Sequence, residues 1–187
     1  MTVVGHVAAL WRYPVKSMAG EELDAVEVSW HGLAGDRRWA FIRAGQVRSG
    51  FPWLTIRDRP ELAHYRPRFA EPDRPNASLT LVRTPGGREL EVADPALAAE
   101  LGPGVQVMKQ DRGIFDTMPL SLLSTQTLAG LGRLVGTDVA AGGFGPTSSW
   151  RPSSATSPRT PGSAWCCASA GCGCGSMCAT SDAWWST

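Results

Sequence analysis

The sequence predicts a β-rich α+β fold, a barrel-like domain with short helices, followed by a C-terminal tail without a native fold. Many short runs of β-branched and aromatic residues alternate with Gly and Pro turns, and only two segments show helical character. The composition then changes after Val139, beyond which the chain contains no Leu, Ile, Val, Lys or Glu. A length of 187 residues allows one sizeable domain or two small ones.

Three strands are expected in the first part of the chain. Thr2–Val15 is rich in Val, Leu, Trp and Tyr, and Pro14 near its end cannot donate to a ladder. Leu23–Trp30 alternates apolar and acidic residues, as a half-exposed strand does, and a turn at His31 follows it. Trp39–Arg43 is the third predicted strand.

A hairpin and a short helix are expected next. Asn76–Val92 contains two alternating runs around a turn at Pro85-Gly86-Gly87, which predicts a β-hairpin. Asp94 precedes Pro95 in the arrangement of an N-cap and first helical residue, and Gly102 is expected to end that helix.

One further strand and one further helix complete the predicted elements. Val105–Phe115 is expected to be a strand. Ser124–Val135 carries leucines at helical spacing and is followed by Gly136, a common helix terminator.

Charge and hydropathy exclude several classes of protein. With 18 basic and 17 acidic residues, no basic face is indicated, so nucleic acid is not an expected partner. No apolar run approaches the length of a membrane span, and the N-terminus lacks a signal-peptide pattern. A cytoplasmic protein without a membrane partner is the expectation.

The cysteines do not indicate a metal site. All five follow the break in composition, and the paired Cys-x-x-Cys spacing of zinc sites is absent. A disulfide framework would imply secretion, which no other feature supports. We therefore assign the cysteines neither a metal nor a structural role.

Several motifs in residues 3–139 resemble a known family. Tyr13-Pro14-Val15-Lys16-Ser17-Met18 and Gly32-Leu33-Ala34-Gly35-Asp36-Arg37-Arg38-Trp39 are the most specific. The segments Arg57–Leu62 and Asp116–Leu120 extend the match. Together they resemble proteins with a MOSC N-terminal β-barrel domain and a MOSC domain, which include the amidoxime-reducing component.

The resemblance implies a binding site for the molybdenum cofactor (molybdopterin). It matches Lys16 and Ser17 to residues that contact the anionic end of the cofactor, the first as a point charge and the second as a hydroxyl donor. Arg37 matches an arginine that can fork onto phosphate or pterin oxygens. Thr117 matches a cofactor-contacting threonine, while Met118 departs from the serine found in some relatives.

Simpler interpretations stand beside these assignments. Lys16 and Ser17 could lie in a solvated loop, Arg37 could form a surface ion pair with Asp36, and Thr117 could only shape a turn. The histidines have no second ligand at metal spacing, and the upstream tryptophans are expected to be core or rim residues. No catalytic residue and no metal ligand is assigned.

The tail suggests a translation in the wrong frame. If the codons are read in a frame shifted one base back, those of Gly142–Trp150 permit the family's Arg-Phe-Arg-Pro-Asn followed by apolar residues. In the same frame the codons of Arg159–Gly162 and their neighbours permit Glu-Asp-Ala-Trp. A cysteine codon, matching the family's candidate molybdenum ligand, is permitted across Asp182 and Ala183. We hypothesise a one-base frame error near codons 138–142.

These observations divide the chain into an N-terminal β-barrel domain (1–112), the start of a MOSC domain (113–139) and a wrong-frame tail expected to be disordered (140–187). The resemblance implies a molybdenum-dependent oxidoreductase that reduces N-hydroxylated or N-oxygenated small molecules, with electrons from a separate donor protein. Because the MOSC part is truncated, the chain as written is expected to be inactive. The alternative is a carrier of molybdenum cofactor or persulfide sulfur without turnover, and a third possibility is a truncated barrel without a stable fold.

Overall fold

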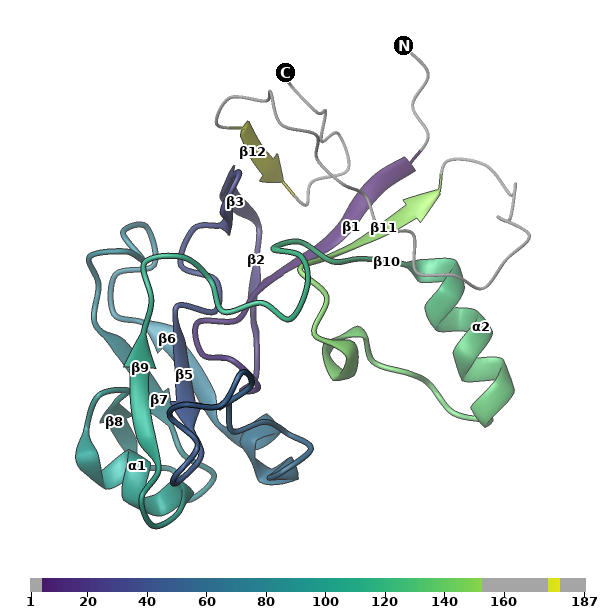
Figure 1. Ribbon diagram of the computed structural model, residues 1–187. Coiled ribbons are helices and arrows are strands. Elements are labelled where there is room, and N and C mark those ends of the chain that lie inside the picture. The colour runs from purple at the N-terminus through teal and green to yellow at the C-terminus, as the bar shows by residue number, and fades with distance from the viewer. Residues whose placement is uncertain (1–4, 153–174, 179–187) are drawn as a thin grey trace. The chain divides into compact units, whose positions relative to one another are not determined.

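The computed structural model describes residues 5–152 and the backbone of 175–178 (Figure 1). The chain divides into two compact units. The first unit consists of Met1–Trp11, Glu22–Ala34 and Met118–Thr187, and the second of Arg12–Glu21 and Gly35–Thr117. The N-terminal strand therefore belongs with residues that follow 117 along the chain.

The first unit is organised around a sheet with the strand order β10-β11-β1-β2. The bounds of these strands are β1 Gly5–Arg12, β2 Glu21–Leu23, β10 Leu122–Ser124 and β11 Ser148–Pro152. β11 pairs antiparallel with β1 and parallel with β10, so it is an interior strand. A small apolar cluster of Leu10, Val26 and Leu33 forms the core of this unit.

A second sheet of the first unit has the order β12-β3-β4. Its strands are β3 Ala25–Ser29, β4 Gly32–Leu33 and β12 Gly175–Cys178. The turn between β3 and β4 carries Trp30, whose side chain is 83% exposed. The expectation that this tryptophan is a core or rim residue is therefore wrong, because it lies at a hairpin tip where no core can cover it.

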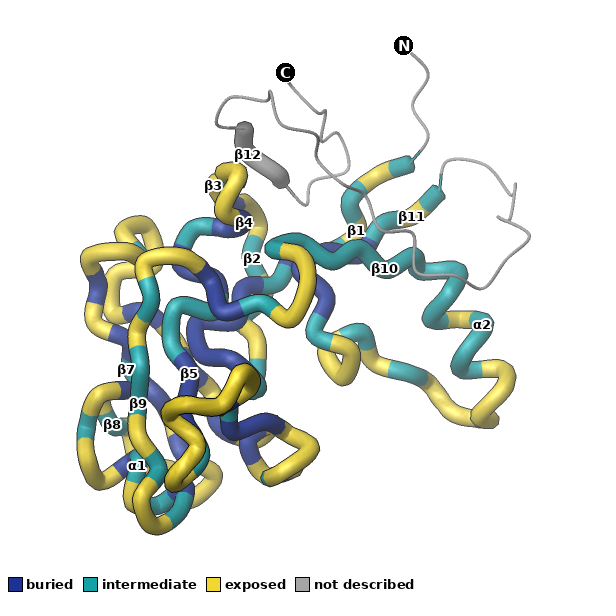
Figure 2. The backbone as a smooth tube through the Cα atoms, in the orientation of Figure 1, coloured by how far each residue is buried: buried dark blue, intermediate teal, exposed yellow. Residues whose placement is uncertain are grey.

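The second unit contains two sheets and the larger core. The sheets are β5 Trp39–Ile42 with β9 Gln106–Lys109, and β6 Arg66–Phe69, β7 Thr80–Arg83 and β8 Glu89–Glu91 in that order. The helical segments are η1 Pro60–His64 and α1 Pro95–Leu101. Buried residues from these elements form one cluster, which includes Phe41, Leu62, Val82 and Leu97. Figure 2 shows this burial along β5 and β7.

Both predicted helices are present, and Asp94, Gly102 and Gly136 cap them as predicted, whereas Ser124 is an N-cap and not the first helical residue. The Asp94 side chain accepts a hydrogen bond from the Ala96 amide at the start of α1, and Gly102 caps its end. α2 spans Thr125–Val135, with the Ser124 hydroxyl accepting from the Thr127 amide. The C-cap of α2, Gly136, has φ 75°, a left-handed conformation that glycine adopts without strain.

The strand predictions are confirmed in part. The hairpin is β7–β8, and the third predicted strand is β5. The predicted strand Leu23–Trp30 contains a break after Leu23, and Val105–Phe115 is a strand only at Gln106–Lys109. The chain is thus β-rich with two α-helices, but among the described residues the strands form four separate sheets that do not close into a barrel.

The predicted tail differs from expectation in its first part. η2 spans Ala141–Phe144, and β11 follows with Ser148 and Ser149 each only 4% exposed. A strand was not predicted here because the segment lacks apolar periodicity, whereas β11 is held by backbone pairing on both sides. Residues 153–174 and 179–187 of the predicted tail lie outside the described residues. The predicted domain boundaries remain predictions.

Candidate functional site

The first motif, Tyr13–Met18, and residues 35–39 of the second motif lie side by side in the second unit. Val15 forms a β-bridge with Trp39, and the Lys16 amide donates to the Trp39 carbonyl over 2.8 Å. The Arg37 amide donates to the Tyr13 carbonyl over 2.6 Å. Segments more than twenty residues apart in sequence are therefore joined by their backbones, which fixes the positions of Lys16 and Arg37.

Backbone strain is concentrated at the predicted site residues. In the described part of the chain, only Ser17 (φ 67°) and Arg37 (φ 47°) are non-glycine residues with positive φ. This left-handed conformation is uncommon outside glycine, and such residues gather at ligand-binding and catalytic loops. Both were assigned to the site from the sequence, so strain and resemblance indicate the same two loops.

The Lys16 ammonium group is held in a buried position. The residue is only 8% exposed, and its Nζ donates to Asp116 Oδ1 over 2.6 Å and to the Ile114 carbonyl over 3.4 Å. The centroid of the Phe51 ring lies 5.9 Å from Nζ. The alternative interpretation of a solvated loop is therefore wrong for the Lys16 side chain, because its charge is removed from water and compensated by a carboxylate.

Arg37 is fixed by a buried carboxylate. Its Nη1 donates to Asp36 Oδ2 over 2.5 Å, and Asp36 is 1% exposed while the Arg37 side chain is 17% exposed. The Tyr13 amide donates to Asp36 Oδ1 over 2.7 Å. This is therefore not the surface ion pair that the sequence alone allowed.

The charges around Arg37 act on two titratable groups. Burial raises the pKa of the Asp36 carboxyl, and the Arg37 guanidinium offsets part of that rise. Burial also raises the pKa of Tyr13 to about 12, although Arg37, stacked 4.6 Å above its ring, acts in the opposite direction. The Tyr13 phenol is therefore protonated at neutral pH.

One short segment contacts both cations. The Ile114 amide donates to the Arg37 carbonyl over 2.8 Å, while the Ile114 carbonyl accepts from Lys16. Phe115 places its ring 5.9 Å from the Arg37 guanidinium carbon, and Asp116 pairs with Lys16. Residues 114–116 thus place the two cationic side chains at one site.

Ser17 directly follows Lys16 in the chain, and Thr117 directly follows the partner of Lys16, Asp116. Ser17 is half-buried, and its hydroxyl makes no hydrogen bond to any residue that the structure describes. Thr117 is exposed. The structure therefore links Lys16 and Arg37 through Ile114, with Ser17 next to Lys16 in the chain, while the roles of Ser17 and Thr117 as cofactor contacts remain predictions.

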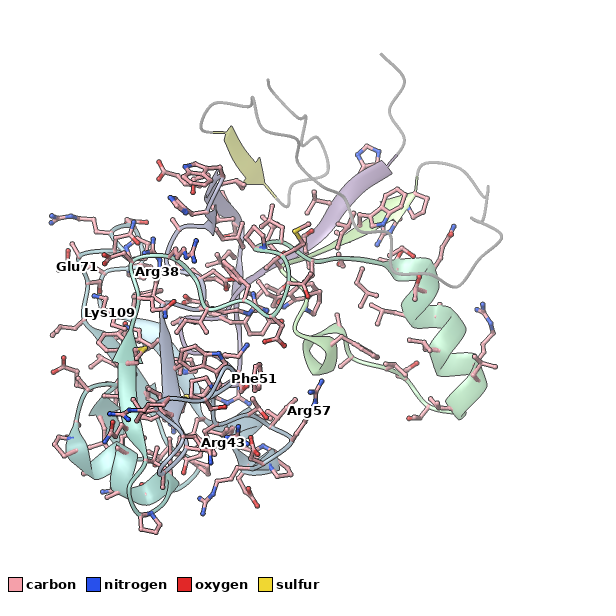
Figure 3. All side chains as sticks on the ribbon, in the orientation of Figure 1. Arg38, Arg43, Phe51, Arg57, Glu71 and Lys109 are labelled. Carbon is pink, nitrogen blue, oxygen red and sulfur yellow. The ribbon has the colours of Figure 1, made fainter. Side chains whose placement is uncertain are left out.

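A loop carrying Phe51 borders Lys16. Arg43 and Phe51 are labelled in Figure 3. Arg43 Nη2 donates to the Phe51 carbonyl over 2.6 Å, and Nη1 lies 3.4 Å from Asp58 Oδ1. Thr55 donates to the other Asp58 oxygen from both its amide and its hydroxyl, which lowers the pKa of Asp58. These bonds fix the loop that carries the exposed Phe51 ring.

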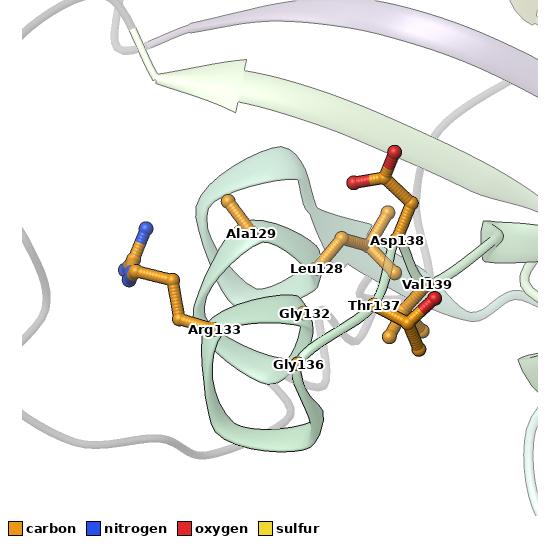
Figure 4. A pocket seen from close by; sticks show the side chains of 8 residues that line it. All are labelled: Leu128, Ala129, Gly132, Arg133, Gly136, Thr137, Asp138 and Val139. Carbon is orange, nitrogen blue, oxygen red and sulfur yellow. The ribbon is translucent and has the colours of Figure 1, made fainter.

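A shallow hollow of about 680 Å³ lies against α2 in the first unit (Figure 4). It is lined by Leu128, Ala129, Gly132, Arg133, Gly136, Thr137, Asp138 and Val139. None of the predicted site residues lines it. Its lining offers one acidic and one basic side chain, so it does not suggest a cofactor site by itself.

Among the residues described, no three His, Cys, Asp or Glu side chains are grouped so that they could hold a metal ion. The five cysteine side chains lie outside the part of the chain whose side chains are described. All three histidines are exposed. None of the described helices is long and apolar enough to cross a bilayer.

Sequence reasoning missed most of the partners that build the site. Asp116, Ile114 and Phe51 contact Lys16 from positions far along the chain, and their contacts depend on the fold. The one available signal was the position of Asp116, which directly precedes the predicted Thr117.

Comparison with known proteins agrees with these motifs. Residues 4–116 match the family described as the MOSC N-terminal beta barrel domain. The match contains Lys16, Ser17, Arg37 and Asp116. No curated protein matches the chain.

Proposed function

The chain belongs to the MOSC N-terminal beta barrel domain family, and on this basis we propose that it derives from a molybdenum-cofactor-binding oxidoreductase. The proposed reaction is the two-electron reduction of N-hydroxylated or related N-oxygenated small molecules. The sequence keeps the residues proposed for the phosphate end of the cofactor, and none of its cysteines stands in the motif of the family's candidate metal ligand. The observation that carries the proposal is the buried Lys16 ammonium beside the strained Arg37 turn.

The residues present fit the phosphate end of a molybdopterin. Lys16 and Arg37 supply two positive charges linked through Ile114, and Ser17 supplies a hydroxyl without a partner among the described residues. Charge-assisted hydrogen bonds from such groups are the usual means of binding phosphate. Phe51 and Phe115 add aromatic surface close to the cations.

The metal end has no comparable support in the described residues, which contain no group of metal ligands. In the shifted frame the family's candidate metal ligand would lie across codons 182 and 183, outside the described residues. In the shifted frame, Ser148 and Ser149 are replaced by Phe, Leu, Ile or Val, if both serines have TCN codons. Both positions are buried in an interior strand, where apolar residues are the ordinary occupants.

The protein's own side chains would bind the cofactor and orient it. When bound, the cofactor supplies the two-electron redox chemistry that no side chain can provide. Lys16 and Arg37 would hold the phosphate and so fix the position of the opposite end, with the buried Asp36 keeping Arg37 in place. In the overall reaction the N–O bond breaks and the oxygen leaves as water, with two electrons from a separate donor protein and two protons from solvent.

A second candidate function is a carrier that binds molybdenum cofactor or persulfide sulfur without turnover. The same phosphate-binding residues would serve it, since holding the phosphate needs no redox step. The two functions differ in whether substrate is reduced when electrons are supplied.

The test compares the 187-residue chain with a protein whose frame is restored by one base near codon 140. Both are produced in a host that makes the cofactor, and pterin and molybdenum are measured per chain. We expect little molybdenum on the chain as written, and both components on the restored protein, which reduces amidoximes when given a reductase. Binding without reduction by any electron donor would favour the carrier. Stoichiometric molybdenum on the 187-residue chain would contradict the proposal.

Cellular location and the frame error are tested separately. We expect the protein in the cytoplasm, which fractionation of the producing cells would check. Resequencing codons 138–142 tests the frame hypothesis, and an intact frame without a missing or additional base would contradict it.

A further inference from the structure

Lys16 already has an anionic partner in the structure. Asp116 Oδ1 lies 2.6 Å from Nζ, within the range of a charge-assisted hydrogen bond. The Ile114 carbonyl takes a second ammonium hydrogen over 3.4 Å. Lys16 has three donors, so a carboxylate and a carbonyl account for two of them.

We propose that Asp116 is a built-in competitor for the anion site: its carboxylate holds the position on Lys16 that a phosphate takes, and it swings into solvent when the phosphate binds. This inference rests on the phosphate-binding role proposed above for Lys16. In this role the carboxylate compensates the Lys16 charge while no phosphate is bound, and a binding anion must displace it.

The two partners differ in burial, which decides which one moves. The Lys16 side chain is 8% exposed, whereas the Asp116 side chain is 61% exposed. A buried ammonium without a partner is strongly disfavoured, so Lys16 needs an anion at all times. An exposed carboxylate regains its hydration when it leaves, whereas moving the buried ammonium would disrupt the packing around it. The carboxylate is therefore the mobile partner.

A phosphate gains more at this position than a carboxylate does. It carries up to two negative charges and three acceptor oxygens, so it can bind Lys16 and the neighbouring Ser17 hydroxyl together. Asp116 cannot stay in place, since its charge would then lie within a few ångströms of the phosphate. The Ile114 amide keeps its bond to the Arg37 carbonyl and the Ile114 carbonyl keeps its bond to the Lys16 ammonium, so the site keeps its shape while the carboxylate leaves.

The test is a titration of the whole 187-residue chain with inorganic phosphate, in a buffer that contains no other phosphate. Two-dimensional NMR spectra recorded during the titration give the dissociation constant for phosphate. Asp116→Asn removes the competing charge and is expected to tighten phosphate binding roughly three- to tenfold. Asp111→Asn makes the same change of net charge at an exposed position on the adjoining segment and is expected to change binding less than about twofold.

A second pair of variants separates competition from a structural role. Lys16→Met is expected to weaken phosphate binding at least tenfold, on the order expected for a charge-assisted contact. In that background Asp116→Asn should have no more effect than Asp111→Asn, because the carboxylate acts only through Lys16. Chemical shifts away from the site report whether each variant keeps the fold.

The outcomes are distinct. Weaker phosphate binding by Asp116→Asn would show that the carboxylate supports the anion site, and unchanged binding would show that it does not compete with phosphate. Either result would overturn the inference and leave the proposed function intact. No phosphate binding by either the wild type or Asp116→Asn would overturn it as well. Absence of pterin from the restored protein, with tighter phosphate binding by Asp116→Asn, would contradict the proposed function alone.

Discussion

Replacing both Ser148 and Ser149 by valine is expected to stabilise the first unit. The two serines lie in β11, opposite Leu10 and Ala9 of β1, and each is 4% exposed. Successive side chains of a strand point to opposite faces, so β11 is covered on both faces. Interior strands of this kind are normally apolar, which the present sequence is not.

The expected gain in the free energy of unfolding follows from the burial of the two valine side chains. A fully buried valine side chain contributes about 1.5–3 kcal/mol relative to an exposed one, and a small overpacking penalty offsets part of this gain. We therefore expect about 1–2 kcal/mol per site and about 2–4 kcal/mol for the pair. For a chain of this size the gain corresponds to an increase in Tm of roughly 4–16 °C.

Urea denaturation followed by circular dichroism measures the free energy of unfolding, and hydrogen exchange of the β1 amides gives a local measurement. Arg151→Val provides a matched control at an exposed position of the same strand and is expected to change stability by less than about 0.5 kcal/mol. If the double valine variant is no more stable than the wild type, the serines suit their surroundings and the shifted frame loses its structural support.

Three further changes test the geometry around the site. Asp36→Asn should lower the free energy of unfolding by about 1.5–3 kcal/mol, because the buried ion pair with Arg37 is lost; an unchanged urea midpoint would contradict this. Gly35→Ala should destabilise by about 2–5 kcal/mol, since its φ is +80° and a Cβ would lie 2.9 Å from Phe69 Cζ; a stable variant would show that the turn is not strained. Because the pKa of Asp58 is lowered in the folded state, its carboxylate stabilises the fold above the ordinary pKa near 3.8, and this stabilisation is lost as the pH falls through the folded pKa. Asp58→Asn should therefore make the free energy of unfolding less dependent on pH between about pH 5 and 2. An identical pH profile for that variant would exclude such a role.

Local chemistry made the helices predictable. Asp94 and Ser124 accept hydrogen bonds from amides two or three residues ahead, so a few neighbouring residues determine where each helix begins. The hairpin β7–β8 was predictable for a similar reason, because its turn lies between two alternating runs.

The strands that were not predicted depend on distant partners. β6 has the sequence Arg-Pro-Arg-Phe and pairs with β7. Its two arginines and its proline are untypical of a strand, so the sequence did not predict one there. β11 has no apolar periodicity and exists through pairing with β1 and β10. No window of sequence contains these partners.

The candidate site likewise contains residues that short motifs predict and residues whose role depends on distant contacts. Lys16, Ser17 and Arg37 were found because they stand in short motifs that resemble a family. Asp116 was not assigned, although its contact with Lys16 is among the shortest at the site, because one hundred positions separate the two residues. The burial of Lys16 likewise follows from the fold, and no local pattern indicates it.

The central claim is that Lys16 holds the phosphate end of a molybdenum cofactor. Pterin fluorescence after oxidation, measured per chain on the frame-restored protein, tests it most directly. We expect the restored protein to carry pterin, Lys16→Met to lose most of it, and Lys109→Met, which removes the same charge from an exposed position, to retain it. Equal pterin on the Lys16→Met variant and on the restored protein would contradict the claim.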